Sequence, residues 1–470
     1  MGSSKPNILV LLTEQHRGDS LSCEGHPVLL TPTMDRIAGR GVRFSRAYSS
    51  CPVCIPARRS LLTGQFPSTH GVLGYASKPW SGSSIADELS KAGYQTAWIG
   101  RDMHQEPPGE RCGFETTILS GMRNPGNPYD RFLEGNQPEG GGGYYGSGVM
   151  HNDYTARPFH LPENLHHTTW TVGRALSWLE DRDRGRPFFL VVSFLAAHPP
   201  LIPPACYFDR YLRTGVPDPH IGDWATPPEN DGIGLGQSSS KVNLTGEALL
   251  SARAGYYGLI NHLDDQMNRL LNPVTGIQRA TDDNTAVIMT SDHGEMLGDH
   301  YCWAKALPYE GAARIPLLIS APRGYGARTN SVVDRPVGLE DILPTCLDIS
   351  GVDIPDYVDG RSLMPLLRGD RDAASSWRRY LHIEYADPRA FHALTDGKEK
   401  YIWFAGDGRE QLFDLKNDPG ECINRADDPD WAGRVGRWRR LMVDELTGRP
   451  EGFTDGDDLI AGRPYPMIME

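Results

Sequence analysis

The stretch of this sequence best suited to covalent chemistry is Cys51–Gly64, which reads CPVCIPARRSLLTG. Its two cysteines have the Cys-x-x-Cys spacing of a redox pair or of half a zinc site. A zinc site requires a second ligand pair at a similar spacing, and none of the other six cysteines forms one. The second interpretation starts at Cys54 alone, which is followed by Ile-Pro-Ala-Arg and then by Ser-Leu-Leu-Thr-Gly.

Local preferences place Cys54 at the start of a helix. Pro56 fixes its own φ and pushes Ile55 towards extended geometry. Residues 58–63 are compatible with a helix, and Gly64 is suited to end it. The N–H groups and the dipole at a helix N-terminus favour an anionic group. We therefore expect Cys54 to lie where an anion can bind.

Two pairs of polar residues come directly after apolar runs that are typical of buried strands. The run NILVLLT ends at Glu14 and Gln15, and the run TAVIMT is followed by a serine and then by Asp292 and His293. Ligand sites of open α/β sheets lie beyond the carboxyl ends of the strands. A parallel sheet brings the two pairs together, and their oxygen atoms suit a hard cation. A solvated strand end is the alternative for each pair.

Two further expected strands end in basic or imidazole side chains. The run YQTAWIG leads into Arg101 and, three residues later, His104. Residues 187–196 form a strand that ends at His198. Taken alone, Arg101 and His104 can be surface residues, and a single histidine such as His198 is more often structural than catalytic.

The remaining pattern is that of alternating helices and strands. We expect helices at residues 32–40, 84–92, 171–180, 245–270 and 340–349, and another strand at 314–321. Residues 106–167 and 216–243 are irregular and show neither the period of a helix nor that of a strand. Long loops of this kind are usually functional, so we assign the first to substrate selection and the second to the rim of a cleft.

The chain of 470 residues is long for a single domain, and its character changes near residue 370. Short strand-like runs follow in hairpin spacing at 380–385, 393–395, 400–404 and 411–415, and a helix is expected at 434–446. We therefore expect a large α/β domain at 1–370 and a smaller subdomain at 371–470.

Composition excludes several classes of function. A net charge of −13 argues against nucleic-acid binding, because such proteins carry a basic face. No apolar run approaches the length of a membrane span, and the N-terminus leads into a strand without the apolar segment of a signal peptide. The eight cysteines are scattered without a framework pattern, which favours a reducing compartment. We expect a cytoplasmic protein.

The motif Cys54-Ile-Pro-Ala-Arg58, followed by Leu62-Thr63-Gly64, resembles the signature of the type I sulfatases. The resemblance extends over nearly the whole chain and is weakest over the two irregular stretches. It implies an alkaline-phosphatase-like α/β fold with a large, mostly parallel central sheet and a small subdomain of a four-stranded antiparallel sheet with a helix. It also implies that a formylglycine-generating enzyme oxidises Cys54 to formylglycine, whose hydrate attacks a sulfate ester.

The resemblance further implies roles for individual residues. Metal ligands are expected at Glu14, Gln15, Asp292, His293 and the residue derived from Cys54. The family usually has Asp-Asp at the first pair, whereas this chain has Glu-Gln. We expect one divalent cation, Ca²⁺ first and Mn²⁺ or Mg²⁺ as the alternatives.

The same comparison assigns catalytic positions. Arg58 holds the formylglycine hydrate, and Lys305 and His198 assist the leaving oxygen. Arg101 takes the place of the family's sulfate-binding lysine, because arginine can also hold sulfate oxygens. His104 matches a family histidine, although one extra residue separates it from Arg101.

Two alternatives to a sulfatase stay open at this point. A phosphonate monoester or phosphodiester hydrolase shares the signature and the Asp-His pair. A non-catalytic binder of sulfated glycans is suggested by the unusual residues Glu14, Gln15 and Arg101. For a sulfatase, the substrate can be an aryl, a sugar or a small alkyl sulfate.

Overall fold

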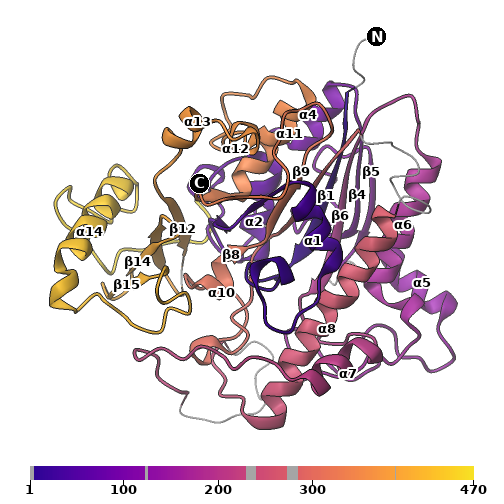
Figure 1. The fold of residues 1–470 in the computed structure, drawn as a ribbon, viewed down its shortest axis with the longest axis horizontal. Helices are drawn as coiled ribbons and strands as arrows, with labels where there is room; N and C mark the ends of the chain where they lie inside the picture. The colour runs from indigo at the N-terminus through magenta and orange to yellow at the C-terminus, as the bar shows by residue number, and fades with distance from the viewer. Residues whose placement is uncertain (1–4, 122–124, 229–239, 273–283, 387, 470) are drawn as a thin grey trace.

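A large twisted sheet forms the centre of the molecule (Figure 1). The computed structural model describes residues 5–121, 125–228, 240–272, 284–386 and 388–469. Eight strands lie in the order β10-β2-β9-β7-β1-β6-β4-β5. The five from β7 to β5 are parallel, and β9 runs antiparallel to its neighbours β7 and β2. The expected mostly parallel α/β sheet is therefore confirmed.

The strands of this sheet are β1 (Asn7–Glu14), β2 (Val42–Phe44), β4 (Gln95–Arg101), β5 (Thr116–Ser120), β6 (Phe188–Ala197), β7 (Thr285–Ser291), β9 (Leu317–Ser320) and β10 (Ser331–Val333). A smaller three-stranded sheet contains β3 (Ala47–Tyr48), β8 (Arg314–Ile315) and β11 (Val337–Gly338). The longer helices around the two sheets are α1 (Pro32–Arg40), α2 (Cys54–Thr63), α4 (Ile85–Lys91), α5 (Pro128–Asn136), α6 (His167–Asp181), α7 (Ala205–Thr214), α8 (Gly246–Leu271) and α11 (Ile342–Ser350).

Helices cover both faces of the large sheet, which explains why its strands are apolar throughout. Alternate residues of β1 enter opposite cores: Val10 packs with α2, α4 and α11, whereas Leu11 packs with α1, α6 and α8. A strand buried on both faces cannot alternate between polar and apolar residues. The continuous apolar runs in the sequence follow from this arrangement.

The signature stretch forms helix α2, and Cys54 is its first residue. The preceding residue, Val53, is extended, but Ile55, expected to be extended before Pro56, is helical because Pro56 lies in the first turn of the helix. Gly64 ends the helix in the left-handed conformation with φ of 69°. Both predicted ends of this helix are confirmed.

The register of the sheet aligns the carboxyl ends of its central strands. Glu14, the last residue of β1, pairs with Ala197 of β6, and Thr13 pairs with Ser291 of β7. His198 and Asp292 are the next residues after those two strands. Side chains from distant parts of the sequence therefore meet at one edge of the sheet.

Two local expectations were wrong. Residues 106–167 are not irregular throughout, because they contain β5 and α5. β5 is a half-buried edge strand with no apolar alternation, and α5 begins at the capping residue Asn127 followed by a proline. The single strand expected at 314–321 is interrupted at Pro316, and its halves β8 and β9 join different sheets. Part of the stretch 216–243 lies outside the described residues.

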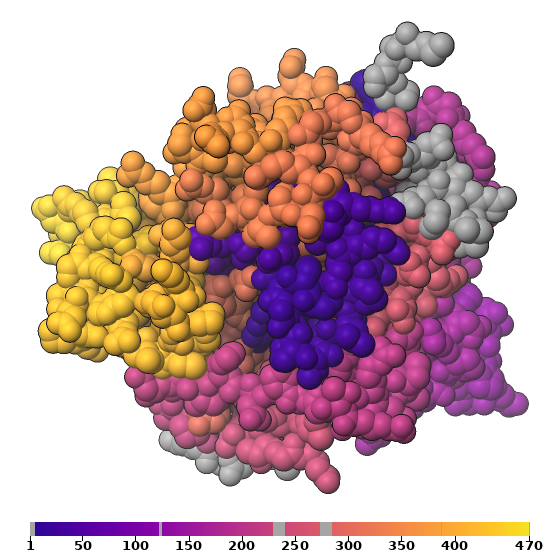
Figure 2. Space-filling view, in the orientation of Figure 1, coloured from indigo at the N-terminus to yellow at the C-terminus, as the bar shows by residue number. Residues whose placement is uncertain are grey.

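The C-terminal residues form the expected antiparallel sheet with a helix. Its strands are β12 (Leu381–Tyr385), β13 (Phe391–Thr395), β14 (Glu399–Phe404) and β15 (Glu410–Asp414), and its helix is α14 (Ala432–Leu446). The later of these residues, in yellow in Figure 2, gather at one side of the molecule. The division near residue 370 stays a prediction. Among the residues that the structure describes, no helix combines the length and apolar character of a membrane span.

Gly100 gives a test of how tightly β4 and β6 are packed. Its φ is +107°, and an added Cβ would lie 2.0 Å from the carbonyl oxygen of Ser193. We expect Gly100→Ala to lower the free energy of unfolding by about 2–4 kcal/mol, since overpacking and a strained backbone act together. The matched control is Gly39→Ala in helix α1, where a Cβ meets nothing within 4 Å. That change should raise stability by about 0.5–1 kcal/mol. Equal effects of the two changes in urea titrations would contradict the packing argument.

Candidate active site

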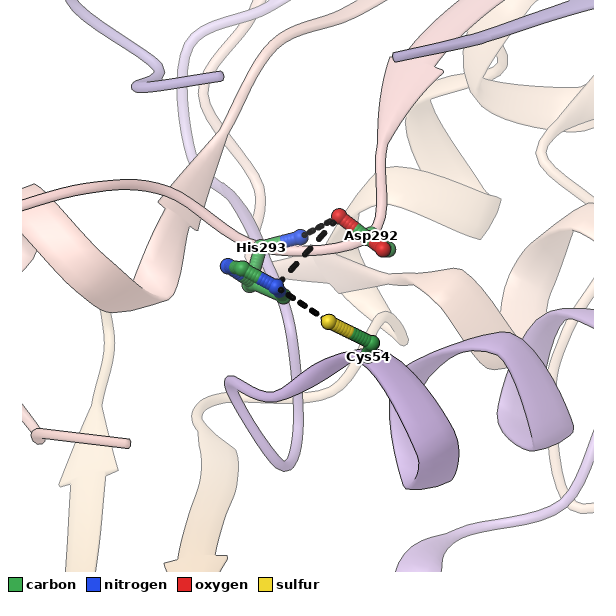
Figure 3. A group of neighbouring side chains, drawn as sticks. All are labelled: Cys54, Asp292 and His293. Carbon is green, nitrogen blue, oxygen red and sulfur yellow. Dashed lines mark hydrogen bonds and ion pairs between the residues drawn. The ribbon is translucent and has the colours of Figure 1, made fainter. Parts of the chain in front are cut away.

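Cys54 lies at the centre of a buried group of polar side chains. Its Sγ is 3.3 Å from Glu14 Oε1, 3.3 Å from His293 Nε2 and 3.3 Å from Lys305 Nζ. Figure 3 shows Cys54 at the start of its helix, pointing towards Asp292 and His293. The structure therefore brings the signature cysteine to the strand ends, as the sequence predicts.

The side chains around Cys54 fit a divalent cation. His293 Nδ1 donates to the carbonyl of Gly294 at 2.8 Å, which leaves the Nε2 lone pair facing Cys54. Burial lowers the pKa of His293 to about 4, so the ring is neutral near pH 7. The carboxylates of Glu14 and Asp292 are also completely buried. Oxygen donors with one imidazole suit calcium or manganese.

Gln15 is held in one orientation by its two polar contacts. Its Oε1 accepts from Lys305 Nζ at 2.7 Å, and its Nε2 donates to Glu295 Oε2. Glu295 is fixed in turn, because its Oε1 accepts from the backbone N–H groups of Leu297 and Ala304. Since the NH₂ group of Gln15 donates to Glu295, its amide oxygen faces Lys305 Nζ, which is itself 3.3 Å from Cys54 Sγ. The amide can therefore act as an oxygen ligand at this position.

Two arginines neutralise the buried carboxylates. Arg58 Nε donates to Asp292 Oδ2 at 3.0 Å, and Arg101 Nε donates to Glu14 Oε2 at 2.7 Å. Burial alone would raise the pKa of Glu14, but Arg101 and Arg58 hold it well below its usual value. Nη2 of Arg58 is buried without a hydrogen-bond partner among the described residues. It lies 3.5 Å from Glu14 Oε2, as an ion pair without hydrogen-bond geometry.

The two expected histidines lie beside this group. His104 has φ of 56° and its Nε2 is 2.9 Å from Asp102 Oδ1, so the extra residue in this loop positions the ring against a carboxylate. Burial and Arg101 lower the pKa of His104. His198 Nδ1 donates to the carbonyl of Pro199 at 2.5 Å. Burial and then Lys305 hold the pKa of His198 well below its usual value.

The charge states of Cys54 and Lys305 follow from the same surroundings. Burial raises the pKa of the Cys54 thiol to about 12. The unmodified side chain is therefore a thiol near pH 7, and thiols are poor nucleophiles. Burial disfavours the cationic form of Lys305, but Cys54, Glu14 and Asp292 raise its pKa overall. Lys305 is consequently the permanent positive charge next to Cys54.

Sequence reasoning did not identify four residues of this site. Asp102 contacts His104, Ser193 Oγ accepts from Arg58 Nη1 at 3.1 Å, and the ring of His151 stacks on His198 with 4.5 Å between centroids. The fourth is Glu295, which follows Asp292 by three residues. Only Glu295 had a signal, since a carboxylate next to a metal-ligand motif suggests a residue that orients the ligands.

Comparison with known proteins agrees with this fold and site. The sulfatase family matches residues 6–352, and the family described as N-sulphoglucosamine sulphohydrolase, C-terminal matches residues 298–444. An arylsulfatase of Clostridium perfringens (strain 13 / Type A) is 37% identical over 99% of both chains. An N-acetylglucosamine-6-O-sulfatase of Bacteroides thetaiotaomicron is 28% identical over 100% of this chain and 91% of the relative. The solved phosphonate monoester hydrolase of Agrobacterium radiobacter is 25% identical with a TM-score of 0.80, covering 97% of this chain and 99% of that chain.

Fold and site together define a hydrolase with the alkaline-phosphatase-like fold. The chain belongs to the sulfatase family, and it is a sulfuric ester hydrolase. This family generally uses a divalent metal ion and a formylglycine made from a cysteine. Cys54, Asp292 and His293 form a group that can hold such an ion.

The orientation of Gln15 can be tested through Glu295. In Glu295→Gln the new amide donates towards Gln15, so the amide of Gln15 must turn and present its NH₂ group to the metal position. We expect the affinity for Ca²⁺ or Mn²⁺, measured by titration calorimetry, to fall about 10–100-fold. Adding the second change Gln15→Glu should restore binding, because a carboxylate can accept from the new amide at position 295 and still offer an oxygen to the cation. Unchanged affinity in the single variant, or no recovery in the double variant, would contradict this orientation.

Proposed function

We propose that this sulfatase uses formylglycine at position 54 as its nucleophilic residue and that Arg58 holds this residue in place. The observation that carries the proposal is the approach of Glu14, His293 and Lys305 to Cys54 Sγ, each at 3.3 Å. The hydrated aldehyde of formylglycine supplies an oxygen nucleophile, which the buried thiol of Cys54 does not offer. We propose that a formylglycine-generating enzyme carries out the oxidation.

We propose that one Ca²⁺ ion binds Glu14, Gln15, Asp292, His293 and the residue at position 54. Four of these five side chains, counting formylglycine at position 54, are oxygen donors, which calcium prefers, while the imidazole and the amide make Mn²⁺ the first alternative and Mg²⁺ the second. Such an ion, when bound, would polarise sulfate oxygens and neutralise charge that develops at sulfur. Arg101, already paired with Glu14, adds positive charge on the side of the sulfate.

Lys305 and His198 are the residues that we assign to the leaving oxygen. Lys305 is cationic and can donate a proton or a hydrogen bond from Nζ. His198 is neutral without substrate, and its Nδ1–H donates a hydrogen bond to the carbonyl of Pro199. It therefore accepts a hydrogen bond at Nε2, and it donates one only after the negative charge of a substrate has raised its pKa. Lys305 carries the larger part of this role.

We propose that His104 accepts a proton in the later step, in which sulfate departs from the residue at position 54. Its pKa is lowered by burial and by Arg101, so the ring is neutral near pH 7 and has a free lone pair. Contact with Asp102 orients the ring and stabilises the imidazolium once it has formed. His104 is thus suited to take the proton from the hydroxyl of position 54 when sulfate departs.

The substrate that we propose is an aryl sulfate or a sulfated saccharide, in keeping with the names of the two sulfatase relatives. Hydrolysis of a phosphonate monoester is the second candidate, because a phosphonate monoester hydrolase shares the fold over nearly the whole chain. The test is the ratio of kcat/KM for 4-nitrophenyl sulfate and 4-nitrophenyl phenylphosphonate. A higher value for the sulfate supports a sulfatase, and a higher value for the phosphonate supports the second candidate.

Cys54 and Cys51 are a matched pair for testing the nucleophile. Both thiols are buried, but only Cys54 is followed by x-Pro-x-Arg and lies at the metal position. We expect peptide mass spectrometry to find the thiol-to-aldehyde change at Cys54, and Cys54→Ala to abolish turnover. Cys51→Ala should retain activity at a stability cost of about 1–2 kcal/mol for the lost packing. An aldehyde at Cys51, or turnover by Cys54→Ala, would overturn the assignment.

If Lys305 and His198 assist the leaving oxygen, the loss of kcat/KM on replacing them should depend on the leaving group. General acid catalysis typically raises a rate about 10²–10⁴-fold, and a nitrophenolate leaving group needs little of this assistance. We therefore expect Lys305→Ala to lose much more kcat/KM on a sugar or alkyl sulfate than on 4-nitrophenyl sulfate. His198→Ala should show the same selectivity to a smaller extent, since His198 is neutral in the free enzyme.

Lys398→Ala is the control for this comparison, because Lys398 is exposed on the hairpin between β13 and β14. It should leave both rates unchanged. Equal losses on good and poor leaving groups would mean that Lys305 and His198 only bind the sulfate.

A further inference from the structure

A second group of metal-binding side chains lies in the C-terminal sheet. His382 and Glu384 are two residues apart on β12, so their side chains share one face of the strand. His392 on β13 is the direct cross-strand partner of Glu384. One ligand atom from each of the three lies within 4.8 Å of the others. We propose that His382, Glu384 and His392 form a zinc site separate from the active site.

The positions of the two imidazoles suit a shared metal ion. His382 Nε2 and His392 Nδ1 are 3.0 Å apart, and Glu384 Oε2 is 3.9 Å from His392 Nδ1. Two nitrogen atoms at this separation can both lie about 2.0–2.1 Å from one Zn²⁺ ion. Two imidazoles and a carboxylate are a ligand set that zinc uses, with a fourth position left for water. The sheet register produces this arrangement without any special loop.

The residues around the three ligands orient them as in known metal sites. Glu445 Oε1, from α14, is 3.4 Å from His382 Nδ1, the nitrogen that does not face His392. A carboxylate at the second nitrogen of a ligating histidine fixes its tautomer and raises its basicity. Arg449 Nη1 donates to Glu384 Oε2 at 2.6 Å, and the hydroxyl of Tyr465 donates to the same oxygen. Both bonds hold the carboxylate in place on the side of Oε2.

The cluster can be reached from solvent, and its surroundings carry both signs of charge. Glu445 lies next to His382, and Arg449 is bound between Glu384 and Glu451. A cavity of about 370 Å³ is lined by His382, Glu384 and Glu445 together with Arg361, Arg378 and Arg379, so an ion can enter from solvent. Glu384 and His392 are themselves buried, as expected for strong ligands.

The competing explanation is a hydrogen bond between the two histidines in a protein without metal at this position. That bond would occupy His382 Nε2 and His392 Nδ1 and leave the buried Nε2 of His392 without a partner, as it is among the described residues. The two explanations differ in zinc content. They therefore require a measurement on the folded protein.

The test is the zinc stoichiometry of the untagged full-length protein after dialysis against Zn²⁺ and Ca²⁺, measured by elemental mass spectrometry. We expect His382→Gln to bind one zinc ion fewer per chain than the wild-type protein. The control His160→Gln, at an exposed histidine, should match the wild type. Asp292→Asn in the active site should keep the zinc ion. Equal zinc content in wild type and His382→Gln, or loss of all zinc in Asp292→Asn, would overturn the proposal.

A milder variant guards against misfolding. Glu445→Gln keeps the shape of a partly exposed side chain and removes only the carboxylate next to His382 Nδ1. We expect its zinc affinity to fall about 10–100-fold, with its calcium affinity unchanged. Wild-type zinc affinity in this variant would show that the histidines bind no metal through this arrangement. The outcome is independent of the assays that test the proposed sulfatase mechanism.

Discussion

The need to balance buried charge governs the arrangement of this molecule. Glu14, Asp102 and Asp292 are held at the carboxyl edge of the sheet, and they face the cations Arg58, Arg101 and Lys305. An unpaired charge at this depth costs several kcal/mol, so each group requires its partners. The buried charges are all paired only when the aligned strands, helix α2 and the loop that carries Lys305 are in place. The fold and the reactive group are therefore stabilised together.

Much of this arrangement could be predicted from the sequence, because the strongest signals are local. Apolar runs locate the central strands, and polar residues directly after them locate the edge where Glu14 and Asp292 meet. Other features depend on contacts that no local pattern encodes. Strand β5 pairs only with β4 at the edge of the sheet, and Ser193 of β6 contacts Arg58 of α2, which lies 135 residues away in the sequence.

The small C-terminal sheet contributes to the stability of the signature region. The outer edge of β12 is not open, since the N–H of Glu384 donates to the carbonyl of Ser50 and that of Ala386 donates to Leu73. Apolar residues of this sheet also share a core with Cys51 and Val53. Pairing an edge strand in this way removes a site for aggregation. It also means that disturbance of β12 is transmitted to the segment just before Cys54.

The burial of helix α2 sets a time limit for the proposed oxidation of Cys54. All residues of this helix are buried, so an enzyme that carries out this oxidation would have to reach the motif before the chain has folded. The carbonyl of Ser50 obtains its partner only when Glu384 has been synthesised, and β1 pairs with β6 and β7, which are synthesised much later. At about 5–20 residues per second, translation takes tens of seconds from Ser50 to Glu384. The long sequence separation of these contacts therefore delays folding, and the proposed oxidation of Cys54 would fall within that delay.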